Sequence, residues 1–419
     1  MTAQLIKAGA NWVDGARFFD REAELEELRE RVRNGAHTLL TAQRRMGKTS
    51  LVRELLRQLE DEGSFATVFV DLEAANDPAD AVAEIAIRAK PVQTAWRRIG
   101  SFFANHLRDV RDHIDEVAVS EIKVKLRAGI DAGNWQHQGD QVFAALASSE
   151  RPVVLAIDEL PILVNRLLKG ADYRVTAERT TATDELLAWL RKNAQEHRGA
   201  VILILSGSVG LEPVLRQAGL SAHANIYSPL ELHPWSHDTS SRCLAALART
   251  YDLDLSEDVR SEICRRLRCC VPHHVQQFFD YLHQHLRRKG TTTATTDDVH
   301  QVYERDFLGV RGQVDLEHYE GRLRMVLGVA DYTTALALLT EAAVNDGLLT
   351  HQAIRSYRDA LASSDADDAV AIENILYSLE HDGYLQRRAD GYEFVSGLLQ
   401  DWWRARHGQY FTPIEDRPI

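Results

Sequence analysis

Short apolar segments alternate with amphipathic ones along the first half of the chain. Apolar residues recur at helical spacing from Leu25 to Val32, and a short apolar run follows at residues 37–41. A second helical pattern covers residues 49–59, and residues 66–72 form another apolar run that predicts a buried strand. Because buried strands that alternate with helices form parallel sheets, this order predicts an α/β fold.

The alternation continues, after one interruption, as far as residue 234. Residues from about 91 to 138 do not fit it, and we interpret them as an insertion. Further strands are predicted at residues 153–157, 200–205 and 226–232. The sequence therefore predicts that residues 1–234 form an α/β core with an insertion near residues 91–138.

The second half of the chain has mainly helical patterns. Apolar residues at three- and four-residue spacing predict a helical region over residues 235–318. Three more helical patterns follow, at residues 333–344, 351–361 and 368–381. Two short alternating segments around Asp390-Gly391 then predict a β-hairpin. Since three helices and a hairpin are typical of a winged helix, we predict such a domain at residues 319–419.

Composition and charge narrow the class of protein. The chain has 419 residues, of which 45% are hydrophobic and 26% charged, the balance of a folded soluble protein. Its net charge of −13 gives no general attraction to DNA, RNA or an anionic membrane. The longest apolar runs are much shorter than the roughly 18 to 20 residues that span a bilayer. With no visible secretory signal, the sequence predicts a cytoplasmic protein without a membrane segment.

The cysteines agree with a reducing compartment. Cys243, Cys264, Cys269 and Cys270 lie in one helical stretch, which predicts buried thiols and no disulfide framework. Cys269 to His274 include residue types that bind zinc, but they lack two properly spaced ligand pairs. We therefore favour ordinary packing over a metal site here.

The segment between the first predicted strand and the next helix has the pattern of a phosphate-binding loop. Residues 42–49, AQRRMGKT, match GxxxxGK[ST] except that Ala42 replaces the first glycine. In this pattern, main-chain N–H groups and a helix N-terminus hold phosphates, the lysine reaches the β- and γ-phosphates, and the hydroxyl ligates Mg²⁺. The predicted nucleotide-binding residues are Gln43, Arg44, Arg45, Met46, Gly47, Lys48, Thr49 and Ser50.

A second motif supplies carboxylates at the end of the strand predicted at residues 153–157. Asp158 is predicted to hold Mg²⁺ together with Thr49, and Glu159 to polarise the water that attacks the γ-phosphate. Ser206 follows another predicted strand and could sense the γ-phosphate or orient the water, although a plain turn is the alternative. The predicted catalytic residues are therefore Glu159, Lys48 and Ser206.

Several motifs together resemble the archaeal-type AAA ATPases, which are P-loop proteins related to the origin-recognition and STAND ATPases. The resemblance covers roughly residues 19–403 and rests on FDRE at 19–22, QRRMGKTSL at 43–51, VVLAIDELP at 153–161, SGSVGL at 206–211 and VPHHVQ at 271–276. It implies a parallel sheet of order 5-1-4-3-2, a helical lid and a C-terminal winged helix. It also implies ATP bound with Mg²⁺.

The sequence departs from the family pattern in three places. Ala42 replaces the first loop glycine, Cys269-Cys270 replace a frequent glycine pair, and no arginine follows residues 221–225. An arginine finger is therefore unassigned; Arg198 is a candidate, with a solvated surface charge as the alternative. His273 could act as a second nucleotide sensor, with packing as the alternative.

Three functions are compatible with these motifs. The leading hypothesis is an ATP-binding, slowly hydrolysing switch that engages a protein partner or a second copy of itself. The alternatives are a DNA-binding ATPase of the replication, transposition or defence type, and a scaffold that binds ATP without hydrolysis. Residues 359–386 contain no lysine or arginine, which disfavours DNA binding by the third helix of the winged-helix domain. The acidic residues there are Asp365, Asp367, Asp368, Glu373, Glu380 and Asp382.

Overall fold

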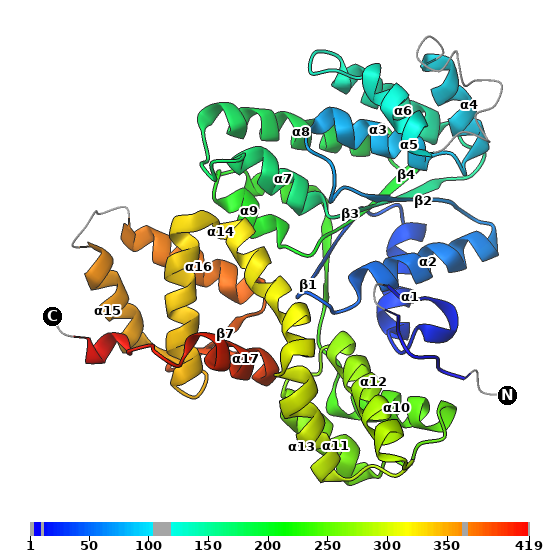
Figure 1. Cartoon of the computed structure of the whole chain (residues 1–419). Coiled ribbons are helices and arrows are strands. Elements are labelled where there is room, and N and C mark those ends of the chain that lie inside the picture. The colour runs from blue at the N-terminus through cyan, green and yellow to red at the C-terminus, as the bar shows by residue number, and fades with distance from the viewer. Residues whose placement is uncertain (1–3, 10–11, 104–118, 363–367, 418–419) are drawn as a thin grey trace. The chain divides into compact units, whose positions relative to one another are not determined.

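The computed structural model describes residues 4–9, 12–103, 119–362 and 368–417. The chain divides into two compact units (Figure 1). The sheet unit consists of Arg21–Thr41 and Lys48–Leu232, and the helical unit consists of Met1–Asp20, Ala42–Gly47 and His233–Ile419. The phosphate-binding loop pattern is thus divided between them, because residues 42–47 cluster with the helical unit.

A five-stranded parallel sheet forms the core of the sheet unit. Its strands are β1 (Thr38–Ala42), β2 (Ala66–Asp71), β3 (Val153–Asp158), β4 (Val201–Ser206) and β5 (Ser228–Leu232). Their spatial order is β2-β3-β4-β1-β5, which is the predicted order 5-1-4-3-2 read from the other edge. The predicted α/β fold class is therefore confirmed. Every residue of β3 and β4 is buried, as expected for central strands covered on both faces.

Helices cover both faces of this sheet. Figure 1 shows α1 (Glu22–Arg33) and α2 (Lys48–Glu62) on one face. The opposite face carries α3 (Pro78–Arg88), α6 (Trp135–Ala147), α7 (Leu160–Lys169) and α8 (Ala177–Glu196). The shorter elements of the unit are α9 (Leu211–Arg216) and the 3₁₀ helix η3 (Ser221–Ile226).

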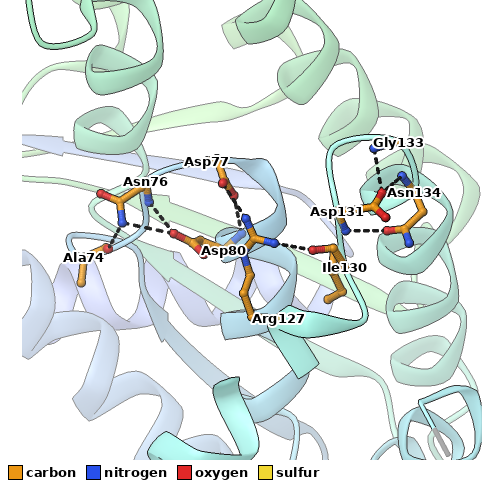
Figure 2. A network of polar contacts seen from close by, with 9 residues as sticks. All are labelled: Ala74, Asn76, Asp77, Asp80, Arg127, Ile130, Asp131, Gly133 and Asn134. Atoms are coloured by element: carbon orange, nitrogen blue, oxygen red, sulfur yellow. Dashed lines mark hydrogen bonds and ion pairs between the residues drawn. The ribbon is translucent and has the colours of Figure 1, made fainter. Parts of the chain in front are cut away.

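The predicted insertion contains α4 (Gln93–Phe102) and α5 (Val119–Ala128), and residues 104–118 lie outside the described part of the chain. Arg127 joins α5 to the start of α3 (Figure 2). Its guanidinium donates to the carboxylates of Asp77 and Asp80, each at 2.7 Å, and to the carbonyl of Ile130. Ion pairs thus fix this end of the insertion to the core.

Residues 235–318 are mainly helical, as predicted, and begin with four helices. They are α10 (His237–Thr250), α11 (Glu257–Leu267), α12 (Pro272–Lys289) and α13 (Thr296–Val302). Thr295 caps α13: its hydroxyl accepts from the N–H of Asp298, and the Asp298 carboxylate accepts from the N–H of Thr295. A π-helical segment, η4 (Tyr303–Phe307), leads to the next helix.

The helix α14 (Val310–Val344) begins earlier than predicted. Gly328, with φ 80° and ψ −178°, interrupts it, and the predicted helix at residues 333–344 is its second part. Among the described residues, α14 is long and apolar enough to cross a membrane, with a mean hydropathy of 1.3. Leu323, Leu338 and Leu339 are nevertheless buried, and α14 packs against α16 and α17. An interrupted helix with buried apolar residues is typical of a protein core.

The C-terminal part of the helical unit combines helices with a small sheet. Its elements are β6 (Leu348–Thr350), α15 (His351–Ala362), α16 (Asp368–His381), β7 (Leu385–Arg388), β8 (Gly391–Phe394) and α17 (Gly397–His407). The predicted hairpin β7–β8 is present, and the unpredicted strand β6 extends it to the order β6-β8-β7. Trp402 and Trp403 are buried and anchor the last helix, α17, in the core. Asp365 and Asp367, invoked against DNA binding, lie outside the described residues.

Candidate functional site

The start of α2 supplies the lysine and hydroxyl of the phosphate-binding pattern. Lys48 is the first residue of this helix, and its side chain is buried, as is that of Ser50. Gly47 precedes the helix with φ +91°, a backbone conformation that glycine adopts without strain. The N–H groups of the first helical turn have no partners within the helix, so this terminus suits an anion.

Thr49 and Asp158 meet at the carboxyl end of β3. The Thr49 hydroxyl donates to Asp158 Oδ2 at 2.6 Å, and the Ser206 hydroxyl donates to Asp158 Oδ1 at 2.7 Å. Asp158 and Ser206 are both buried. Three residues from α2, β3 and β4, predicted separately from the sequence, thus share one hydrogen-bonded cluster.

Glu159 follows Asp158 in a left-handed backbone conformation, with φ 59°. Such a conformation is uncommon for a residue with a side chain and is often found at functional sites. The Glu159 carboxylate accepts hydrogen bonds from the Ser208 N–H at 2.8 Å and the Ser208 hydroxyl at 2.9 Å. The segment after β4 therefore holds Glu159 as well as Asp158.

The sequence analysis assigned the sensing role to Ser206 and no role of its own to Ser208, which lies in the same segment, SGSVGL. Gly207 explains why this segment can approach α7 so closely. A Cβ atom at Gly207 would lie 2.6 Å from Cδ of Pro161 and 3.5 Å from Oε2 of Glu159. The segment Ser206-Gly207-Ser208 therefore makes specific hydrogen bonds to Asp158 and Glu159 and is not a plain turn.

A further carboxylate, Asp71, stands at the carboxyl end of β2, in register with Asp158 on β3. Burial raises its pKa, and the charges of Asp158 and Glu73 add to this effect, although the N–H of Glu73 donates to Asp71 and opposes it. The sequence contained a signal for Asp71, because this residue ends the apolar run ATVFVD. The signal was weaker than that for Asp158, which is followed directly by a second carboxylate, Glu159.

The side chains of the loop residues contact the helical unit to which residues 42–47 belong. Arg45 forms an ion pair with Asp315, and Arg44 donates to the carbonyl of His318 at 2.8 Å. Burial and the charges of Arg322 and Arg45 lower the pKa of Arg44. Met46 is 1% exposed. The side chains of Arg44 and Arg45 are thus engaged by α14, and their contribution to phosphate binding would come from the main chain.

Arg198, His273 and the cysteines were also singled out from the sequence. Arg198 is exposed. Burial and the nearby Arg45 lower the pKa of His273 to about 3, so this imidazole is neutral at pH 7. The four cysteines are free and buried, as predicted. Within the described ranges, no group of three or more His, Cys, Asp or Glu side chains could hold a metal ion by itself.

Comparisons with known proteins identify the family and the fold of the chain. The family described as an ATPase domain predominantly from Archaea matches residues 18–234, just over half of the chain. No curated protein matches the sequence.

Two solved structures share the fold. The Walker-type ATPase PABY2304 of Pyrococcus abyssi is 17% identical, with a TM-score of 0.60 over 94% of this chain and 98% of that one. The Aeropyrum pernix ORC2 protein, in ADPNP and ADP complexes, is 13% identical, with a TM-score of 0.52 over the same shares of the two chains. At these identities the likeness establishes the fold alone.

Proposed function

Because this chain belongs to the ATPase family found predominantly in Archaea, we propose that it binds ATP with Mg²⁺ and hydrolyses it slowly, as a nucleotide-dependent switch. The observation that carries the proposal is the cluster of Thr49, Asp158 and Ser206, with Glu159 beside it. The nucleotide complexes of the Aeropyrum pernix ORC2 protein are consistent with ATP as the ligand.

The proposed nucleotide site uses the start of α2 and the loop before it. Lys48 neutralises charge on the β- and γ-phosphates, while main-chain N–H groups of residues 43–50 hold the phosphate oxygens. The hydroxyl of Thr49 and the carboxylate of Asp158 lie 2.6 Å apart. Hard oxygen donors of this kind fit Mg²⁺, which takes its remaining ligands from phosphates and water. When bound, Mg²⁺ neutralises developing charge on the phosphates.

Glu159 is the proposed general base. Its carboxylate follows Asp158 directly, and Ser208 fixes its orientation through two hydrogen bonds. A carboxylate held in this way can orient a water molecule and accept its proton as the water attacks the γ-phosphate. Ser206, which donates to Asp158, keeps that carboxylate in place and is the proposed sensor of the γ-phosphate.

The switch would act on a protein partner or a second copy of this chain in the cytoplasm. We interpret residues 235–318 as the lid and residues 319–419 as a winged-helix domain that respond to the nucleotide. Arg358 on α15 pairs with Glu373 on α16 at 3.0 Å, so this acidic side chain is partly neutralised. A helix without its own lysines or arginines still disfavours duplex DNA as the partner.

ATP binding tests the first half of the proposal. Calorimetric titration with ATP and Mg²⁺ should show binding by the wild-type protein and a loss of at least tenfold in affinity for Lys48→Ala. Lys192→Ala is a matched control, because this lysine is half exposed and pairs with Asp140 in the same unit. The control should bind ATP like the wild type.

Phosphate release, measured on the same samples, tests the second half. Turnover by the wild type that is lost in Glu159→Gln, with ATP binding retained, supports the hydrolysing switch. ATP binding without turnover by the wild type would favour the scaffold, and stimulation by added duplex DNA would favour the DNA-binding alternative. Absence of ATP binding by the wild type would contradict the proposal as a whole.

A further inference from the structure

Arg45 occupies a strained position in the phosphate-binding loop. Its φ is +66°, in the left-handed region, where a side chain is unfavourable and glycine is not. Nothing in the loop pattern GxxxxGK[ST] requires an arginine at this position. The contacts of the Arg45 side chain are available to offset this backbone strain.

The contact is made with α14, within the helical unit. Arg45 Nη2 lies 2.9 Å from Asp315 Oδ1, and the Arg45 guanidinium lies 5.9 Å from the centre of the Tyr319 ring. The second oxygen of Asp315 accepts from the side-chain amide of Gln277 on α12. Burial works to raise the pKa of Asp315, but the Arg45 charge and these hydrogen bonds hold it below its ordinary value. Asp315 is therefore an ionised partner near neutral pH.

The two preceding loop residues are engaged in the same region. Arg44 donates to the carbonyl of His318 and lies 5.9 Å from the centre of the Tyr319 ring. The Gln43 side chain packs on Gly383, where a Cβ atom would lie 2.0 Å from Cδ of Gln43. Tyr384, the next residue, donates to the carbonyl of Tyr319 at 2.7 Å. Three consecutive loop side chains thus contact one end of α14 and the turn before β7.

We propose that Asp315 and Tyr319 are positioning residues for the nucleotide: they hold Arg45 in its left-handed conformation and so set the main chain of the phosphate-binding loop. This inference deepens the proposed function and rests on it. The residues that would bind phosphate are main-chain groups, and Asp315 acts on them only through Arg45.

A consequence follows for the whole helical unit. If α14 favours the loop conformation that binds nucleotide, then bound nucleotide favours the same arrangement of α14 to an equal degree, because coupling between two sites is reciprocal. Nucleotide bound at the loop thereby changes the conformational preference of α14, the helix that leads into the C-terminal elements. Residues 310–327, the part of α14 before Gly328, would carry the response.

The test compares two substitutions at the strained position. Arg45→Ala removes the anchor and keeps a side chain in the left-handed region, whereas Arg45→Gly removes the anchor and the strain together. In calorimetric titration with ATP and Mg²⁺, we expect Arg45→Gly to bind ATP roughly tenfold more tightly than Arg45→Ala. If Arg45 only stabilised the fold, both variants would bind ATP equally.

Asp315→Ala extends the test to α14. We expect its ATP affinity to fall about five- to tenfold, with Asp315→Glu restoring part of the loss. The control is Glu317→Ala, since Glu317 is half exposed, lies two positions away and pairs with Arg406. This control should bind ATP like the wild type.

Amide hydrogen exchange provides a readout that does not depend on turnover. ATP should slow exchange in residues 310–327 of the wild type and of Glu317→Ala, and should not slow it in Asp315→Ala. Equal ATP affinities for Arg45→Gly and Arg45→Ala, or an ATP response of α14 that persists in a folded Asp315→Ala, would overturn the inference while leaving the proposed function intact. A wild-type protein that binds no ATP would overturn both.

Discussion

The carboxylate of Glu159 accepts two hydrogen bonds from Ser208, one from the main-chain N–H at 2.8 Å and one from the hydroxyl at 2.9 Å. The two residues come from the ends of neighbouring strands, β3 and β4, and meet because Gly207 permits the close approach. Two donors on one oxygen restrict the orientation of the carboxylate. In the proposed reaction, this contact orients the Glu159 carboxylate toward the attacking water molecule.

Ser208→Ala removes the hydroxyl and leaves the N–H in place. Because one net hydrogen bond is worth about 1 kcal/mol, we expect ATP turnover to fall roughly three- to tenfold, with the ATP Kd unchanged. Steady-state phosphate release and calorimetry measure the two quantities. Ser221→Ala serves as the control, since Ser221 donates to Glu212 away from the cluster. Unchanged turnover in Ser208→Ala would show that the hydroxyl does not orient Glu159.

Gly207→Ala tests the close approach itself. The added Cβ would meet Cδ and Cγ of Pro161 at 2.6 and 2.8 Å, and a proline ring cannot rotate away. We expect a loss of about 1 to 3 kcal/mol in the free energy of unfolding, measured by urea titration, and reduced turnover. Gly100→Ala is the matched control because nothing lies within 4 Å of its Cβ position. Equal stability of the two variants would contradict this packing.

Arg127→Met tests the attachment of the insertion. The substitution leaves the carboxylates of Asp77 and Asp80 without their shared cation (Figure 2). We expect the free energy of unfolding to fall by about 1 to 3 kcal/mol. Lys125→Met should cost under about 0.5 kcal/mol, since its ion pair, at 3.7 Å, is with the exposed Glu121 on the same helix. A loss in Lys125→Met as large as in Arg127→Met would argue against a specific attachment.

Asp298 predicts a pH dependence of stability. Its buried carboxylate accepts from Lys289 at 2.8 Å and pairs with His285 at 2.9 Å. Burial opposes ionisation, but these bonds and those from Thr295 hold its pKa well below the ordinary value. Its contribution to stability is therefore complete above the unfolded pKa of about 3.9 and is lost as the pH falls through the lower folded value.

The comparison with Asp298→Asn measures that contribution. In urea titrations near pH 6.5, we expect the wild type to be more stable by about 1 to 3 kcal/mol. The difference should shrink as the pH is lowered below about 4. A stability difference that stays constant between pH 6.5 and pH 3 would indicate lost packing rather than a lost charge.

The sheet was predictable because the strands β1 to β4 are short apolar runs that alternate with helices, a pattern typical of parallel sheets. The helix α7 was missed, since it begins at Leu160 directly after the acidic pair and contains Pro161. A proline is tolerated in the first turn of a helix, where its missing N–H has no partner to lose. The ring of the same proline leaves no room for a Cβ atom at Gly207.

Within the insertion, the helix α5 was not predicted from the sequence. Ile122 and Leu126 are both fully buried and lie four residues apart, so they share one face of α5. With so few apolar residues, helical and alternating patterns overlap. Packing against α3 decides between them.

The candidate site was predictable where one local motif supplies the residue. Lys48 and Thr49 follow from the loop pattern, and Asp158 and Glu159 from the acidic end of a strand. The pair Arg45–Asp315 joins residues 270 positions apart. No local pattern encodes such a pair, because it depends on how α14 packs against residues of its own unit.

Phosphate release from ATP by the wild type and by Glu159→Gln, with ATP binding measured on the same preparations, decides whether Glu159 is the catalytic base. We predict that the wild type releases phosphate slowly, and that Glu159→Gln binds ATP with wild-type affinity but releases phosphate at least a hundredfold more slowly. Equal phosphate release by the two proteins would contradict the assignment of Glu159 as the base and, with it, the proposed site.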